Sequence, residues 1–155
     1  KIRTEASASS RVVSEIWKRG LDEIGIRAEF EVGNFADNLK DAAGCRLMMW
    51  GGAWHADYPE GENFLQLLYG PNAGRGNYGC YRSKAFDNLY RQAVRLPPGE
   101  KRNALYVMMN RQMEADTAWV VHVSRTRNWL VRPRVLGFKK HPIMQSDWQY
   151  LDVAR

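Results

Sequence analysis

A short stretch in the first half of the chain combines groups that could do chemistry. Trp54, His55, Asp57 and Tyr58 lie within five consecutive positions. A carboxylate forms a charge-assisted hydrogen bond with a cation, and rigid aromatic rings beside it supply apolar walls that lower the local dielectric. This stretch is therefore suited to capturing a cationic group. A purely structural interpretation stays open, because an aspartate here can also cap a following helix and aromatic rings can fill a core.

A catalytic interpretation would use His55 or His122 as base, Asp57 to orient it, and Cys45, Cys80 or a serine as nucleophile. The sequence contains no GxSxG, HExxH, GxxxxGK[ST] or CxxC motif to support it. The histidines and cysteines also lack the spacing of metal ligands, so we expect neither a metal nor a cofactor. A hydrolase using His55 and Asp57 remains the alternative to a binding protein, and an interaction module without a small ligand is a third possibility.

The charge of the chain is unevenly distributed. The net charge is +6, yet residues 1–80 hold nine Lys/Arg against eleven Asp/Glu, whereas residues 81–140 hold thirteen against four. The basic residues are scattered over predicted helices and strands rather than gathered among stacking aromatics, so nucleic acid is not an expected partner. No apolar run approaches the ~20 residues of a membrane-spanning helix.

The elements that must position the Trp54–Tyr58 stretch follow from hydrophobic periodicity. Ser9 or Ser10 caps a predicted helix that Gly25 ends, and residues 26–32 alternate as a half-buried strand. A short helix over 34–43, with Phe35 and Leu39 inward, precedes the nearly continuous apolar run 45–50. That run is typical of a strand covered on both faces in a parallel sheet. The stretch thus follows the carboxyl end of a strand, where open α/β sheets bind ligands.

The rest of the chain is predicted to be mainly helical and then extended. Helices are expected over 62–69, from a Ser83 cap to residue 97, and over 100–114, the last with Leu105, Met108, Met109 and Met113 inward. Strands are predicted over residues 119–123, 127–131 and 148–153. A chain of 155 residues can bury a sizeable core without a disulfide or metal, so pairing of Cys45 with Cys80 is permitted but not required.

An ordered set of segments carries a family resemblance over essentially the whole chain. The segments are LDEIGIRAEFEV, WGGAWHADYPEGENFLQLLYG, NYGCYRSKAFDNLYRQA, EKRNALYVMMNRQMEAD and RTRNWLVRPRVLGF. In this order and spacing they resemble the C-terminal part of the family 5 extracellular solute-binding proteins, the peptide and oligopeptide receptors of ABC importers.

The resemblance implies an α/β fold that is part of the second lobe of a two-lobed, type II-like periplasmic-binding-protein fold. Residues 1–120 would belong to that lobe, and the chain would recross the hinge near 121–125. Residues 121–155 would be the hinge crossing and the C-terminal segment, with strands returning toward the first lobe. The implied protein is a periplasmic or extracellular receptor, not an enzyme, whose partners are its ligand and a membrane permease, and which is monomeric at full length. The secretion signal would belong to a preceding portion.

The resemblance also implies roles for individual residues. The aspartate of the W-x-A-D-Y loop, here Asp57, would pair with the ammonium group of a peptide, and Trp54 would pack on the ligand beside Tyr58 and His55. Glu60-Gly61 departs from the Asp-Pro of many relatives, and the position of His55 varies widely. Some members of the family bind nickel chelates, opines or sugars instead of peptides. An acidic residue in this loop favours a ligand that bears an amine.

Overall fold

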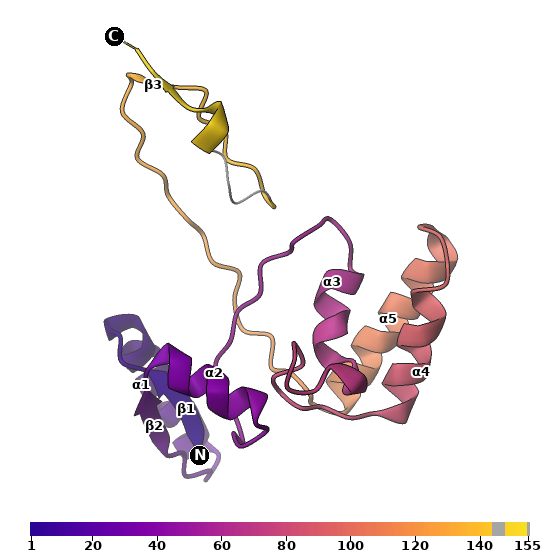
Figure 1. Ribbon diagram of the computed structural model, residues 1–155. Helices are drawn as coiled ribbons and strands as arrows, with labels where there is room; N and C mark the ends of the chain where they lie inside the picture. The colour runs from indigo at the N-terminus through magenta and orange to yellow at the C-terminus, as the bar shows by residue number, and fades with distance from the viewer. Residues whose placement is uncertain (144–147, 155) are drawn as a thin grey trace.

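The structure is a computed structural model that describes residues 1–143 and 148–154. It has a small sheet-containing part at the N-terminus, a helical part in the middle and an extended C-terminal arm (Figure 1). No helix in the described ranges combines the length and apolarity that crossing a bilayer requires. The helices and strands are β1 Ile2–Glu5, α1 Ala8–Glu23, β2 Phe30–Gly33, α2 Phe35–Ala43, α3 Glu62–Leu65, α4 Lys84–Ala93, α5 Glu100–Ala115, β3 Val135–Leu136 and β4 Asp152–Val153.

The N-terminal part is built on a short parallel sheet. β1 pairs with β2 in register Ile2↔Phe30, and on its other side Arg3 forms an isolated parallel bridge to Trp50. The Arg3 amide donates to the carbonyl of Met49 at 2.8 Å. β1 was not predicted from the sequence, because four residues with one large aliphatic side chain give no readable period.

Helix boundaries in this part follow local capping chemistry. Ser7 caps α1, and its hydroxyl accepts from the Ser10 amide at 3.0 Å, two to three residues before the predicted cap. Gly25 ends the helix as predicted: its φ is +76°, and the Ile26 amide reaches back to the Leu21 carbonyl at 2.8 Å, as in a Schellman motif. The α2 helix has the predicted bounds, but Asn38 and Ala42 are its buried residues, while the predicted inward residue Phe35 is exposed.

The predicted doubly covered strand at 45–50 is wrong. Only Trp50 pairs, Cys45 takes a left-handed φ of 55°, and Met48 is 85% exposed. Its pairing partner β1 is only four residues long, and no layer packs over Met48. The predicted strand 26–32 is likewise reduced to β2, because β1 offers no partner to its first residues.

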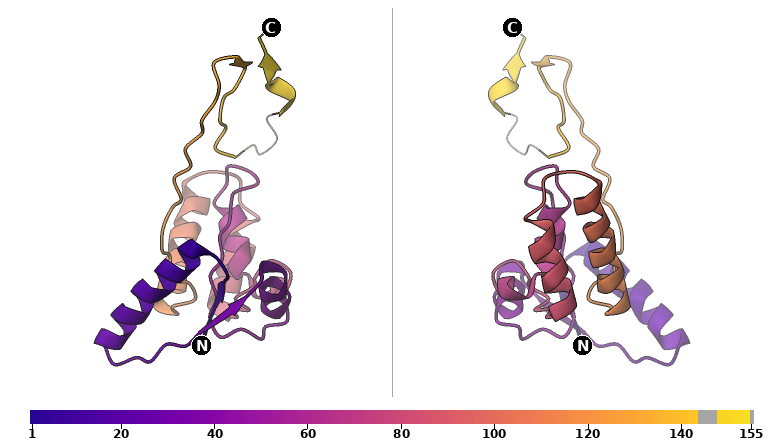
Figure 2. Two further views of the ribbon diagram at one scale, coloured as in Figure 1. Left: turned by 90° about the vertical axis from the view of Figure 1, so that its left-hand side faces the viewer. Right: turned by 90° about the vertical axis from the view of Figure 1, so that its right-hand side faces the viewer.

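The helical part contains the core of the described residues. α4 and α5 pack side by side with α3 across α5 (Figures 1 and 2). Ser83 caps α4 as predicted, with its hydroxyl accepting from the Phe86 amide at 3.4 Å. Met109 and Met113 are buried as expected, but Met108 is half exposed. The core residues are Leu65, Leu68, Phe86, Ala93, Tyr106, Met109 and Met113.

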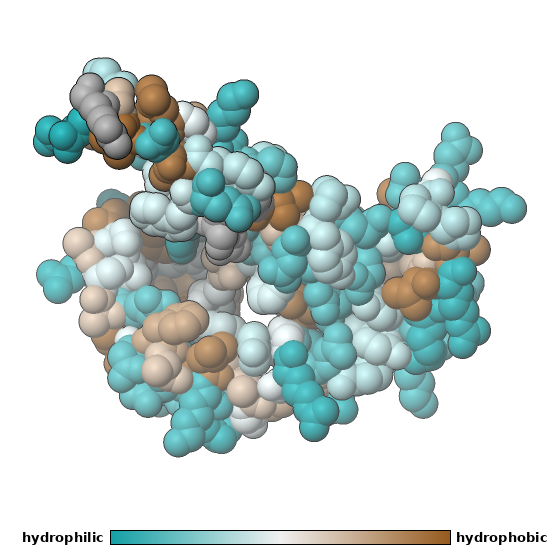
Figure 3. Space-filling view, turned by 45° about the horizontal axis from the view of Figure 1, so that its top comes forward, coloured by the Kyte–Doolittle hydropathy of each residue, from teal (hydrophilic) through white to brown (hydrophobic). Residues whose placement is uncertain are grey.

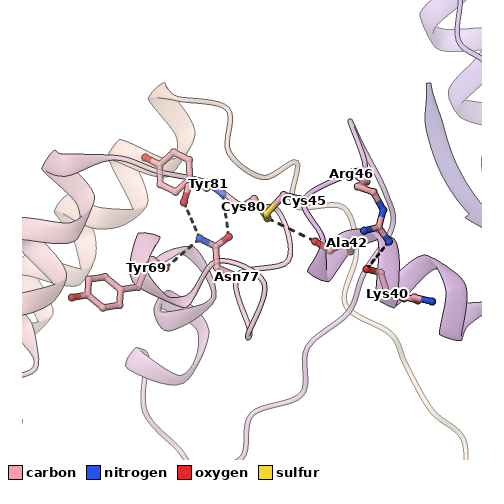
Figure 4. Close-up of a disulfide and its surroundings, with 8 residues drawn as sticks. All are labelled: Lys40, Ala42, Cys45, Arg46, Tyr69, Asn77, Cys80 and Tyr81. Atoms are coloured by element: carbon pink, nitrogen blue, oxygen red, sulfur yellow. Dashed lines mark hydrogen bonds between the residues drawn. A yellow bond between two sulfur atoms is a disulfide. The ribbon is translucent and has the colours of Figure 1, made fainter.

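A disulfide between Cys45 and Cys80 joins the two parts, with 5.7 Å between the Cα atoms (Figure 4). Beside it Gly74, at φ +78°, approaches so closely that a Cβ would lie 2.6 Å from the Ala43 carbonyl oxygen. The buried side chain of Asn77 holds this turn, donating to the carbonyls of Tyr69 at 3.2 Å and Tyr81 at 2.8 Å. The disulfide settles the question, left open by the sequence, of whether Cys45 and Cys80 pair.

The strands predicted over 119–123 and 127–131 are absent. This segment runs away from the helical part as an extended arm with no strand partner, and Leu130 is fully exposed (Figure 2). The predicted strand 148–153 is a 3-10 turn over Trp148–Tyr150 followed by β4, which pairs antiparallel with β3. Alternating apolar residues make strands only where another strand supplies hydrogen-bond partners.

The molecule exposes far more surface than a compact protein of its mass. Its accessible surface is 11,905 Å², whereas a folded monomer of 17.9 kDa should expose about 8,000 Å². Apolar side chains are open over the sheet-containing part and on the C-terminal arm (Figure 3). The expectation of a sizeable core is therefore wrong for this arrangement, because the helical core is small and α1 buries no residue.

Candidate functional site

The loop 51–61 leaves the sheet at the predicted edge. Because Trp50 pairs parallel to Arg3, the chain emerges on the side of the carboxyl ends of β1 and β2. It then crosses to α3 without helix or strand (Figure 1). The four predicted site residues are all exposed on this loop, Trp54 and Tyr58 each by 42%.

The loop is fixed by a residue that we did not predict. Asn63, in the first turn of α3, is fully buried. Its Oδ1 accepts from the indole Nε1 of Trp54 at 2.8 Å and from the backbone amide of Asp57 at 3.1 Å. Its Nδ2 donates to Oδ2 of Asp57 at 3.4 Å. The available sequence signal was the residue type, since asparagine side chains often hydrogen-bond to nearby backbone groups.

Tyr58 is held at its polar end by Glu62. The hydroxyls of Tyr58 and Tyr90 both donate to the Glu62 carboxylate, and Tyr90 stacks on Tyr69 with ring centroids 4.3 Å apart. Burial and then the bond to Glu62 raise the pKa of Tyr90, and the same carboxylate raises the pKa of Tyr58. Both tyrosines therefore stay protonated donors through the neutral range.

The exit of the loop explains the Glu60-Gly61 departure. Glu60 forms an ion pair with Arg102 of α5, which anchors the loop to the helical part. Gly61 packs flat against Tyr106, and a Cβ at this position would lie 3.1 Å from that ring. A glycine here lets the loop approach α5 closely, and the preceding glutamate spans the remaining distance to the guanidinium.

These partners leave one acid of the loop without a cation. Glu60 is paired with Arg102 and Glu62 with two tyrosines, whereas no basic side chain in the described ranges lies within 4.0 Å of the Asp57 carboxylate. Asp57 also does not cap α3, whose N-cap residue Gly61 makes no side-chain hydrogen bond. The structural alternative of a helix-capping aspartate is therefore not observed.

The cysteine thiols and His122 of the catalytic interpretation are not available at the loop, which holds His55 and Asp57. Cys45 and Cys80 are bonded to each other, so neither is a thiol nucleophile in this form. His122 lies at the start of the arm with its ring 5.7 Å from that of Trp17 on α1, not at the loop. Within residues 1–143 and 148–154, no group of three or more His, Cys, Asp or Glu is arranged to hold a metal ion.

Comparison with known proteins agrees with the fold. No family model matches the sequence. The periplasmic oligopeptide-binding protein OppA of Salmonella typhimurium is 27% identical over 126 residues, which are 81% of this chain and 22% of that protein. The periplasmic binding protein DppA of Helicobacter pylori, solved in complex with the peptide STSA, matches 77% of this chain at a TM-score of 0.68 and 27% identity.

The murein tripeptide-binding protein MppA of Escherichia coli matches in fold alone. It covers 99% of this chain at a TM-score of 0.78 and 15% identity. The chain spans 22% of OppA, 24% of the DppA chain and 30% of the MppA chain, hence less than a third of each. These matches confirm a partial α/β lobe of the periplasmic-binding-protein fold, and they show that the peptide-binding proteins OppA and DppA are homologues of this chain.

Proposed function

We propose that this chain is a ligand-binding portion of the periplasmic receptor of an ABC importer, and that it captures a peptide or another amine-bearing solute. The observation that carries the proposal is Asp57, an acid held in place by Asn63 with no cation of its own. A ligand ammonium would supply the missing charge and form a charge-assisted hydrogen bond. The homology to peptide-binding proteins supports the same ligand class.

The aromatic residues of the loop fit the role of ligand walls. The indole N–H of Trp54 is taken by Asn63 and the hydroxyl of Tyr58 by Glu62. Their polar ends are thus engaged by the protein, and their half-exposed ring faces remain for apolar parts of a ligand. His55 stands exposed on the same loop, which suits contact with a variable ligand side chain.

The proposed mechanism is binding and release without chemistry. The ligand enters between two lobes, closure excludes water, and the closed receptor docks on a membrane permease. Residues 1–120 would form part of the second lobe, residues 121–125 would cross the hinge, and the segment after them would return to the first lobe. The segment 119–131, which pairs with no strand among the described residues, supports this division. We expect the complete receptor to be monomeric.

Substitution of Asp57 tests the proposal in the complete receptor. The ligand is first identified by mass spectrometry of protein purified without refolding, and the same peptide is synthesised with a free and with an acetylated N-terminus. Asp57→Asn should weaken binding of the free-amine form by 2–5 kcal/mol or about 30-fold and more, because it leaves a buried ammonium unpaired. It should barely change binding of the acetylated form.

Asp22→Asn is the matched control, because Asp22 is an exposed acid on α1, away from the loop. If calorimetry gives wild type and Asp57→Asn equal affinity for the free-amine peptide, Asp57 is not the partner of the ligand ammonium. Recovery of a nickel chelate, an opine or a sugar would replace the peptide with another ligand class of this family. Turnover of a peptide or ester that His55→Ala abolishes would favour the hydrolase.

A further inference from the structure

Asn63 is buried behind the candidate binding surface, out of reach of a ligand. It is fully buried, whereas Trp54 and Asp57 are exposed on the loop in front of it. Both residues hydrogen-bond to its one amide group, at 2.8 Å for the Trp54 indole and at 3.1 and 3.4 Å for Asp57. One buried side chain thus contacts both the proposed charge partner and the proposed aromatic wall.

The chemistry of these contacts requires an amide. The indole N–H and the backbone N–H of Asp57 only donate, so the oxygen of Asn63 must face them, and the remaining NH₂ then faces the Asp57 carboxylate. A carboxylate in place of the amide would keep the two acceptor contacts but would set a negative charge against Asp57. An aliphatic side chain would leave these two donors without their protein acceptor.

Before the anchors at Tyr58 and Glu60, the loop has little besides Asn63 to hold it. Residues 51–59 lie in no helix or strand, and their backbone makes only the local bond from the Glu60 amide to the Tyr58 carbonyl at 2.9 Å besides the Asn63 contact. Asn63 itself is anchored in the first turn of α3, where its backbone N–H donates to the Glu60 carbonyl at 3.1 Å. The direction of the Asp57 carboxylate is therefore set from α3.

We infer that Asn63 is a positioning residue that aims the Asp57 carboxylate and the Trp54 ring at the ligand, and that it thereby sets how strongly the receptor distinguishes a free amino terminus from a blocked one. The inference rests on the proposed function of Asp57. It concerns selectivity rather than overall affinity, because a misdirected carboxylate loses its bond to an ammonium but not the apolar contacts that both forms of a peptide share.

The test uses the complete receptor and the ratio of its affinities for the free-amine and N-acetylated forms of the co-purified peptide. Asn63→Asp and Asn63→Leu should each lower this ratio at least tenfold. In the Asp57→Asn background, Asn63→Asp should lower it no further, because the group being aimed is gone. Asn88→Asp, the same change on an exposed face of α4, should leave the ratio unchanged.

The outcomes separate the two claims. If Asp57→Asn keeps the wild-type ratio, the proposed function fails. If Asp57→Asn removes the preference for the free-amine peptide while both Asn63 variants keep the wild-type affinity ratio, the positioning role of Asn63 is overturned. The proposed role of Asp57 is then retained. A merely structural role would weaken both peptide forms equally and lower the melting temperature without changing the ratio, which also overturns the inference.

A measurement on the wild-type receptor tests the inference even if the Asn63 variants do not fold. In ¹⁵N-labelled protein without ligand, the Trp54 indole N–H and the Asp57 amide should exchange with solvent at least tenfold more slowly than the neighbouring His55 amide. The Trp54 signal is assigned by its loss in Trp54→Phe. Exchange of both groups at the rate of the His55 amide would show that Asn63 does not hold them, and would overturn the inference.

Discussion

Single side chains at the loop exit are tied to the helical core, and Tyr106 is the most deeply buried of them. It lies under Gly61 and 5.9 Å beneath the Arg102 guanidinium, and burial raises its pKa to about 12. The ordinary value is about 10. Between these two values the unfolded chain has lost a proton that the folded chain keeps, so folding stability falls as the pH rises.

Tyr106→Phe should therefore change the alkaline limb of the stability profile. In wild type, ionisation of Tyr106 should not affect the free energy of unfolding below pH ~10. Above pH ~10 it should lower the free energy of unfolding by at most about 1.4 kcal/mol per pH unit, the slope for one proton. The phenylalanine variant should have a shallower fall between pH ~10 and about 12, measured by urea unfolding. Tyr150→Phe, at an exposed tyrosine, is the control; equal slopes for wild type and Tyr106→Phe would contradict the argument.

At the scale of elements, the sequence was informative wherever the signal is local. The cap at Ser83, the end of α1 at Gly25 and the extent of α5 all follow from residues within one turn. The strands were predicted poorly because pairing depends on distant segments. Site residues were recognised by type and spacing, whereas Asn63 was missed because its role depends on the loop folding back over α3.

The disulfide is the covalent link between the sheet-containing and helical parts, and it encloses the whole candidate loop. Cys45 follows α2, Cys80 precedes α4, and the 35-residue separation contains residues 51–61. Cross-linking a loop of this length should stabilise the fold by about 4 kcal/mol on the chain-entropy model. Both cysteines have left-handed φ values, 55° for Cys45 and 51° for Cys80.

Replacing both cysteines by serine should lower the free energy of unfolding by 2–4 kcal/mol. It should also weaken ligand binding, because both ends of the loop become free to separate. Urea unfolding and calorimetry with and without reductant check this: reductant should destabilise wild type and should not affect the double-serine variant. Unchanged unfolding of wild type under reductant, with the thiols shown to be free, would contradict a bracing role.

At the scale of the whole molecule, the open surface fits the proposal that this chain is one portion of a longer receptor. The chain exposes 11,905 Å², about 4,000 Å² above the expectation for its mass, and it spans under a third of the DppA and MppA chains. α1 is amphipathic yet buries no residue, with its apolar face formed by Val12, Val13 and Ile16. Such a face on a soluble helix normally lies against a neighbouring layer.

A charge on this face should therefore act differently in the isolated chain and in the complete receptor. Ile16 is 54% exposed, so Ile16→Glu should change the stability of the isolated chain by under about 0.5 kcal/mol, as for an ordinary surface position. In the complete receptor the same change should cost at least 2 kcal/mol, because it would place an unpaired charge against an apolar layer. Lys18→Glu, on the polar side of α1, is the control and should be nearly neutral in both. Thermal unfolding of the four variant proteins beside their parents decides the matter: an equal effect of Ile16→Glu in both lengths would mean that the α1 face stays open to solvent in the receptor, and that the excess surface belongs to the native molecule.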